Sequence, residues 1–249
     1  MTKFGVCLPF FAGSSAKTSE INITEIINFA KKSEELGYSS LWGADHFHLG
    51  YEKGEHEIWT ILSVIAQQTK KIRMGPLVLG YSHRNPALLA KMTSTLDFLS
   101  SGRFDLGLGA GWYKAEQNAY GFPWIEKVGT RMDAFEEYIE IILNIFKDNP
   151  HSDYTHFSTP KTKLSPNLTQ KPYPPLLIGG GGEKRTLKLV AKYANIWNIP
   201  SVPPREYSRK LSVLKSHCEN LGRNYSIIEK TIESRILIND NGITDEIID

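Results

Sequence analysis

The stretch LLIGGGG at positions 176–182 decides the fold, because it contains the junction between a strand and a helix. Leu176-Leu177-Ile178 is a short apolar run that is typical of a buried strand. After the glycines, apolar residues recur at helical spacing at Leu187, Val190, Ala191 and Ala194. Four glycines at such a junction leave backbone N–H groups uncovered at the positive end of a helix, which is an arrangement that binds phosphate. A tightly packed turn without a ligand is the alternative.

The same alternation of strand and helix extends in both directions from this junction. Predicted strands cover residues 3–8, 39–42, 72–79, 104–109, 176–178 and 196–199, and a seventh lies within 231–238. A helix is predicted after each strand except the last, and capping residues open two of these helices at Asn22 and at Asn85-Pro86. Repeated βα units predict a parallel sheet, here an α/β barrel of the TIM (β/α)8 type. Either two strands have been merged or the barrel is incomplete at its C-terminus, and a doubly wound open sheet is the alternative.

One domain over residues 1–249 is expected, with an irregular insertion at about 148–175. The insertion contains six prolines and shows no helical periodicity. Long irregular loops are often functional, so we expect this segment to form a lid over the site.

The composition argues against several classes of function. A net charge of +2 gives no electrostatic footprint for nucleic acid, and the five tryptophans do not alternate with basic clusters. No run approaches the roughly 18 apolar residues that a membrane span requires. Cys7 and Cys218 form no disulfide framework, and the first residues do not match a signal peptide. We therefore expect a cytoplasmic protein that binds neither nucleic acid nor membranes.

The carboxyl ends of the predicted strands carry glycines, aromatic side chains and few acids or bases. This profile suits a flat aromatic cofactor with a phosphate tail better than a hydrolytic site. Gly109 and Gly111 would let a planar ligand lie against a strand end, and Trp112 could form a wall beside it. The spacing GxGxG at 107–111 departs from the dinucleotide fingerprint GxGxxG, which makes a Rossmann site the weaker reading.

Asp45-His46 is the acid–base pair at these strand ends. His46 could hold a proton for a developing anion, and Asp45 could orient a neighbouring group. The alternatives are a structural histidine beside a strand-end cap and, more weakly, a zinc site formed with His48; no metal site is predicted. Cys7 is expected to be buried and unreactive. Arg131 is either a solvated helix charge or a group that binds an anion.

Three strings in the chain together resemble the luciferase-like monooxygenase family of flavin- and F420-dependent oxidoreductases. They are LWGADHF (41–47), HRNPALLAKMTSTLDFLSSGRFDLGLGAGWYKAEQNAYG (83–121) and PYPPLLIGGGGEKRTLKLVAKYANIWN (172–198). The resemblance implies a TIM barrel that binds reduced FMN or coenzyme F420 and catalyses hydride transfer or monooxygenation of a small organic substrate. It also implies a homodimer and, for FMN, a flavin reductase that supplies the reduced cofactor.

The resemblance assigns the cofactor-binding residues one by one. The family's phosphate-binding glycine loop falls on Gly179, Gly180, Gly181 and Gly182. Its ring-lining strand end falls on Gly109 and Gly111, and its non-prolyl cis peptide bond on Leu77-Val78.

The resemblance also bears on catalysis. It places His46, after Asp45, at the cofactor. F420-dependent sugar-phosphate dehydrogenases carry an acid where this chain has Trp112, so Glu116 is the candidate proton donor in its place. Methylenetetrahydromethanopterin reductases carry an acid near the position of Cys7, so neither substrate is assigned. A non-catalytic cofactor-binding paralogue and a barrel aldolase or isomerase acting on a phosphorylated substrate are the alternative functions.

Overall fold

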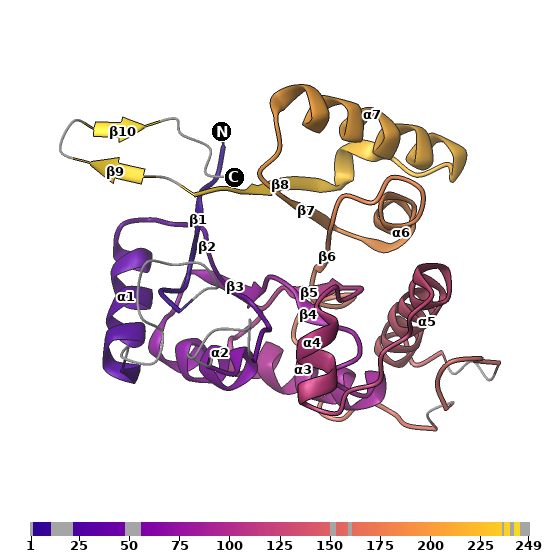
Figure 1. Cartoon of the computed structure of the whole chain (residues 1–249). Helices are drawn as coiled ribbons and strands as arrows, with labels where there is room; N and C mark the ends of the chain where they lie inside the picture. The colour runs from indigo at the N-terminus through magenta and orange to yellow at the C-terminus, as the bar shows by residue number, and fades with distance from the viewer. Residues whose placement is uncertain are drawn as a thin grey trace. The chain divides into compact units, whose positions relative to one another are not determined.

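The computed structural model describes residues 2–10, 22–47, 56–149, 153–158, 161–235, 237–239 and 242–244. Two compact units make up the chain, Met1–Pro175 and Leu176–Asp249, and each is described by itself. Strands and helices alternate along both units, as the sequence predicts (Figure 1). The expectation of one domain over 1–249 stays a prediction.

Parallel strands form the sheets of the first unit. β1 (Gly5–Cys7) pairs with β2 (Ser40–Gly43), and β2 pairs with β3 (Arg73–Pro76). β4 (Leu79–Gly80) pairs with β5 (Leu106–Gly109). The predicted strand 72–79 is therefore two strands. Between them lies the bond Leu77-Val78, which is cis as predicted.

Five helices are described in the first unit. They are α1 (Ile23–Glu35), α2 (Ile58–Gln68), α3 (Pro86–Leu99), α4 (Lys114–Ala119) and α5 (Val128–Phe146). Asn22 and Glu25 form the predicted capping box, in which each side chain accepts a hydrogen bond of 3.0 Å from the other residue's N–H. Asn85 caps α3, which has Pro86 in its first turn. α5 buries an apolar stripe, with Phe135, Tyr138 and Ile139 fully enclosed.

The second unit repeats the same alternation. Its parallel strands β6 (Leu176–Gly179), β7 (Ile196–Pro200) and β8 (Glu229–Glu233) pair in that order. The connections contain α6 (Thr186–Tyr193), α7 (Pro204–Asn220) and the short 3₁₀ helix η2 (Tyr225–Ile227). An antiparallel pair, β9 (Leu237–Asn239) and β10 (Gly242–Thr244), follows. None of the described helices in either unit is long and apolar enough to cross a membrane.

The predicted insertion at 148–175 contains no helix or strand among its described residues. The N–H groups of Thr169 and Gln170 donate to Asp97, near the C-terminal end of α3, at 2.7 and 2.9 Å. The Gln170 amide nitrogen also donates to the carbonyl of Phe104, before the start of β5, at 2.7 Å. Residues 169–170 thus lie at the amino ends of the strands, opposite the edge where the sequence predicts the site. A lid function for the segment stays a prediction.

Candidate active site

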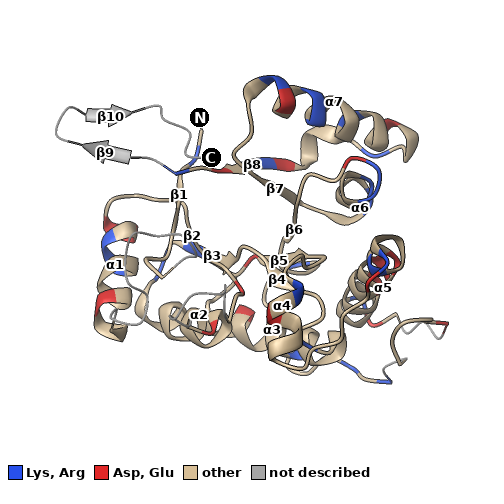
Figure 2. Cartoon of the chain, in the orientation of Figure 1, with Lys and Arg blue, Asp and Glu red and all other residues tan. Residues whose placement is uncertain are grey.

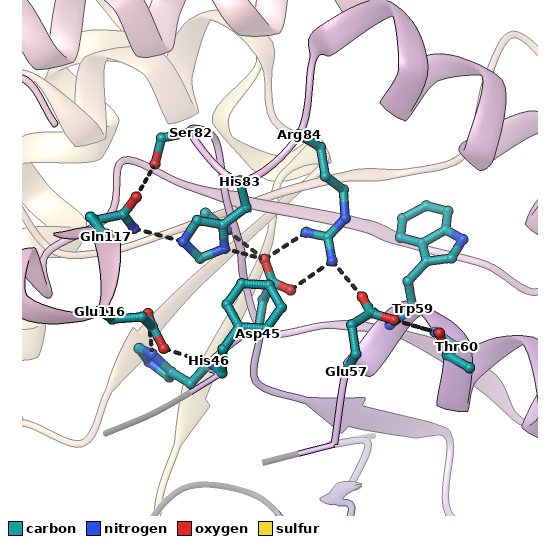
Figure 3. A network of polar contacts seen from close by, with 12 residues as sticks. Asp45, His46, Glu57, Trp59, Thr60, Ser82, His83, Arg84, Glu116 and Gln117 are labelled. Carbon is teal, nitrogen blue, oxygen red and sulfur yellow. Dashed lines mark hydrogen bonds and ion pairs between the residues drawn. The ribbon is translucent and has the colours of Figure 1, made fainter. Parts of the chain in front are cut away.

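Asp45 lies two residues past the end of β2 and is almost completely buried. Its carboxylate accepts hydrogen bonds from the N–H of Gly80 at 3.1 Å and from Nδ1 of His83 at 2.9 Å (Figure 3). Arg84 donates to both carboxylate oxygens, at 2.8 and 2.9 Å. Burial by itself would raise the pKa of Asp45, but the His83 hydrogen bond and the Arg84 charge outweigh burial and hold this pKa below its ordinary value. Asp45 is therefore an ionised anchor for residues 80–84.

His83 connects Asp45 to α4. The side-chain nitrogen of Gln117 lies 2.6 Å from Nε2 of His83, and the Gln117 oxygen accepts a hydrogen bond from Ser82 at 2.8 Å (Figure 3). The His83 ring stacks on Phe122 with a centroid distance of 4.9 Å. Both nitrogens of this buried ring have partners, so His83 fixes the position of α4 relative to β2.

Arg84 extends the network to α2. Its Nη2 lies 2.5 Å from Glu57, which caps α2 by accepting the N–H groups of Trp59 and Thr60 at 3.1 and 2.7 Å. Burial by itself would lower the pKa of Arg84, but the charges of Asp45 and Glu57 raise it above its ordinary value. Arg84 is thus a permanently charged link between the ends of β2 and α2.

His46 forms a second pair beside this network. Its Nδ1 lies 3.1 Å from one carboxylate oxygen of Glu116, and the other oxygen accepts the N–H of Phe47 at 2.7 Å (Figure 3). Glu116 is buried on α4, whereas the His46 side chain is 19% exposed. The His46 ring meets Trp112 edge to face at 5.7 Å, and Trp112 is 69% exposed. Glu116 thus contacts both the side chain of His46 and the backbone of Phe47.

Gly109 and Gly111, at and just past the end of β5, have different structural roles. A Cβ atom added at Gly109 would lie 2.6 Å from Cγ2 of Val78, so Gly109 is needed for the close packing of residues 77–78. At Gly111, φ is +69°, and no heavy atom of the described residues lies within 4 Å of an added Cβ. Gly109 therefore has a packing role, while Gly111 borders open space. The contacts of Leu77, Val78, Gly109, Gly111 and Trp112 with a cofactor stay predictions.

The glycine run 179–182 occupies a strand–turn–helix junction of the second unit, as predicted. Gly180 has a φ of +117°, which favours glycine, and its N–H donates to the carbonyl of Asn198 at 2.9 Å. The N–H groups of Gly181 and Gly182 make no hydrogen bond to a backbone carbonyl of the described residues. The helix that the apolar spacing predicts after the glycines begins at Thr186. Phosphate binding by this run stays a prediction.

The structure brings together four predicted residues, namely Asp45, His46, Trp112 and Glu116. Sequence reasoning missed five residues of the surrounding network: Glu57, Ser82, His83, Arg84 and Gln117. Ser82, His83 and Arg84 directly follow the end of β4, so an analysis of that strand end past Gly80 would have found them.

The remaining candidate residues have simpler surroundings. Cys7 is half-buried, so the expectation of a buried cysteine is wrong; it lies on β1, an edge strand of the described sheet β1-β2-β3. The Arg131 guanidinium lies 4.3 Å from the Trp124 ring centroid and donates to the carbonyl of Ile125 at 3.0 Å. His48 of the alternative zinc site lies outside the described residues. Within the described ranges, no group of three or more His, Cys, Asp or Glu residues could hold a metal.

Comparisons with known proteins connect this geometry to a family. A family model described as luciferase-like monooxygenase matches residues 2–242. An F420-dependent glucose-6-phosphate dehydrogenase from Amycolatopsis mediterranei (strain U-32) is 29% identical over 73% of this chain and 54% of its own length. An FMNH(2)-dependent dimethylsulfone monooxygenase from Pseudomonas putida is 30% identical over 68% of this chain and 46% of its own length. The chain thus spans about half the length of these curated relatives.

A solved structure confirms the predicted fold class. An F420-dependent secondary alcohol dehydrogenase in complex with an F420-acetone adduct aligns with a TM-score of 0.80 at 22% identity, over 93% of this chain and 68% of that chain. Structural neighbours of this kind are TIM-barrel enzymes, so the fold is α/β of the TIM-barrel type, as the sequence predicts.

Proposed function

The chain belongs to the luciferase-like monooxygenase family, and from this we propose that it is an oxidoreductase that uses F420 or reduced FMN. Its similarity to an F420-dependent dehydrogenase and to an FMNH(2)-dependent monooxygenase supports both cofactors. When bound, such a cofactor would supply hydride transfer or oxygen activation at its ring. The substrate would be a small organic molecule.

Two features of the described residues, each taken within its own unit, suit chemical groups that F420 and FMN carry. In the first unit, the open space at Gly111 and the exposed ring of Trp112 suit a planar ring system. In the second unit, the N–H groups of Gly181 and Gly182 at the start of a helix suit a phosphate. These fits support the predicted assignment of Gly179–Gly182 to the phosphate.

The pairing of His46 with buried Glu116 carries the proposal. A carboxylate at 3.1 Å from Nδ1 orients the imidazole, and a histidine held in this way can exchange a proton with a ligand. General acid–base catalysis of this kind contributes about 10²- to 10⁴-fold to a rate. Glu116 therefore supports the histidine, and Asp45 is a positioning residue that holds residues 80–84.

Titration with F420 and with FMN, followed by fluorescence quenching, tests the cofactor. Turnover is measured with F420 on a panel of small alcohols and ketones, and with reduced FMN as oxygen consumption. We expect His46→Ala to lower turnover about 100-fold while the Kd of the cofactor changes less than about 3-fold. Glu116→Gln keeps an acceptor for the Phe47 N–H but removes the charge, so turnover should fall in the same direction.

The outcomes of these experiments are distinct. Binding of neither cofactor would refute the proposed function. Binding with unchanged turnover in His46→Ala would remove His46 from the mechanism. Binding of a cofactor with no turnover on any substrate class would favour the non-catalytic paralogue.

The proposed function also covers the enzyme's compartment, its oligomeric state and the source of its reduced cofactor. We place it in the cytoplasm as a homodimer, and FMN use would require a flavin reductase that supplies the reduced cofactor. Sedimentation at several protein concentrations tests the dimer, and turnover with and without an added reductase tests the dependence on that partner.

A further inference from the structure

Two buried side chains of the second unit hold successive carbonyl groups of the glycine run. The indole Nε1 of Trp197 donates to the carbonyl of Gly180 at 2.9 Å. Nζ of Lys210 donates to the carbonyl of Gly181, also at 2.9 Å. Trp197 is fully buried and Lys210 is 9% exposed, so neither hydrogen bond is an incidental surface contact.

Both donors reach the run from the side of α7. Lys210 belongs to α7, and the Trp197 ring stacks on Tyr207 of the same helix at 5.8 Å with an interplanar angle of 8°. α7 carries acidic and basic residues together (Figure 2). Two acids, one of them on α7, flank Lys210. Its Nζ lies 3.3 Å from Glu206 and 3.7 Å from Glu183. The two glycine carbonyls are therefore turned toward a lysine of α7 and an indole that packs against α7.

Because a peptide group is planar, the direction of each carbonyl also fixes the direction of the N–H group in the same peptide. In a trans peptide the C=O and N–H bonds point in opposite directions. The carbonyl of Gly180 shares its peptide group with the N–H of Gly181, and the carbonyl of Gly181 shares its own with the N–H of Gly182. Holding both carbonyls toward α7 therefore turns both N–H groups away from α7. Neither of these N–H groups donates to a backbone carbonyl of the described residues.

An anion requires this arrangement, because a carbonyl oxygen beside the N–H groups would repel it. We infer that Trp197 and Lys210 are positioning residues of a phosphate-binding glycine turn, whose N–H groups they orient toward the ligand. The inference rests on the proposed function, since F420 and FMN each supply the phosphate.

The glycine at 181 is part of the same arrangement. A Cβ atom added there would lie 2.8 Å from Cδ1 of Ile199 and 3.2 Å from Nζ of Lys210. A side chain at this position would therefore push the lysine away from the carbonyl that it holds. Glycine is needed at 181 so that Lys210 can reach the backbone.

The test compares each cofactor with its form lacking the phosphate. Wild-type protein should bind FMN more tightly than riboflavin, and F420 more tightly than its dephosphorylated riboflavin-like fragment. In Lys210→Met and in Trp197→Phe, we expect the ratio of FMN to riboflavin affinity to fall about 10-fold, while riboflavin affinity changes less than about 2-fold. Trp197→Phe removes one N–H donor without changing any charge, which separates orientation of the turn from attraction by the lysine. If this affinity ratio falls in Lys210→Met but not in Trp197→Phe, the lysine acts directly through its charge and the inference is wrong.

A matched control lies on the same helix. Lys215 is 62% exposed and pairs with Glu219 at 4.0 Å. Lys215→Met removes the same charge from α7, and the affinity ratio should stay within about 2-fold of the wild-type value. If Lys210→Met does not fold, Trp197→Phe alone decides the question.

The inference and the proposed function fail in different ways. If wild-type protein binds a cofactor and both variants keep the full affinity ratio, the inference is wrong and the proposed function stands. If wild-type protein binds neither cofactor, the proposed function is wrong. Titration with inorganic phosphate, followed by ³¹P NMR, then tests the turn by itself. Phosphate binding that weakens about 10-fold in both variants supports the inference, whereas no phosphate binding overturns it.

Discussion

Replacing Asp45 by asparagine should destabilise the protein more than any other single change in the polar network around β2. The asparagine side chain keeps the size of aspartate but loses the charge that Arg84 and His83 face. Arg84 is only 10% exposed, so its guanidinium would stay buried with Glu57 as its remaining carboxylate partner. The side-chain NH₂ group of the asparagine would also face groups that themselves donate hydrogen bonds to Asp45 in the wild-type protein.

The size of the expected loss in stability follows from the burial of both Asp45 and Arg84. Removing one member of a buried ion pair costs about 3–5 kcal/mol, because an uncompensated charge remains inside the protein. Glu57 still compensates part of the Arg84 charge, so we expect the lower limit, a loss of about 3 kcal/mol in the free energy of unfolding at pH 7. Glu57→Gln is the matched control, because Glu57 contacts the same guanidinium but is 36% exposed. It should cost about 1 kcal/mol or less.

Urea unfolding followed by circular dichroism measures both variants, and its pH dependence adds a second readout. The folded-state pKa of Asp45 lies below its ordinary value of 3.8, so the carboxylate stabilises the protein fully above that pH. This stabilisation disappears as the pH falls further and the carboxylate takes up a proton. The difference between wild type and Asp45→Asn should therefore shrink below about pH 4. A loss under 1 kcal/mol at pH 7, or a loss equal to that of Glu57→Gln, would refute the reasoning.

Three further predictions follow from other contacts. Gly109→Ala should cost about 1–3 kcal/mol in a thermal unfolding assay, because its Cβ would overlap Val78, whereas Gly129→Ala in α5, with no atom near its added Cβ, should be neutral or stabilising. Glu34 accepts the N–H groups of Lys70, Lys71 and Ile72; burial by itself would raise its pKa, but these bonds lower it below 4.5. Glu34→Gln should therefore cost about 0.5–1 kcal/mol at pH 7 and nothing in acid, where wild-type Glu34 is protonated; an equal cost at pH 3 and pH 7 contradicts this. Gln117→Leu leaves Nε2 of buried His83 without its amide partner and should cost about 1–3 kcal/mol in urea unfolding, and turnover should fall if α4 positions Glu116.

Local signals predicted most of the fold. The Asn22 capping box and the Asn85-Pro86 start act within four residues, so the sequence contains all that is needed to recognise them. The helix α4 was missed because six residues are too few to show helical periodicity. β9 and β10 were missed for the same reason, since three residues each show little alternation.

The site was predictable only where a residue is marked by its own strand end. Asp45 and His46 follow a strand directly, and Gly179–Gly182 does the same. The contacts of Asp45 with His83 and Arg84 connect residues 38 and 39 positions apart, and those of His46 with Glu116 connect residues 70 positions apart. Such pairs form only when the sheet brings its carboxyl ends to one edge, so no local pattern identifies them.

The strand geometry also explains why Asp45 and His46 do not act as a pair with each other. Successive residues of an extended chain point to opposite sides, so adjacent side chains cannot share a proton. One side chain therefore turns inward, where His83 and Arg84 enclose it, and the other turns toward Glu116 and the exposed Trp112. On α4, the neighbours Glu116 and Gln117 divide in the same way between His46 and His83. Two adjacent residues just past the end of β2 are thus matched with two adjacent residues on α4. The buried contact through His83 fixes the position of α4, and that position places Glu116 beside His46.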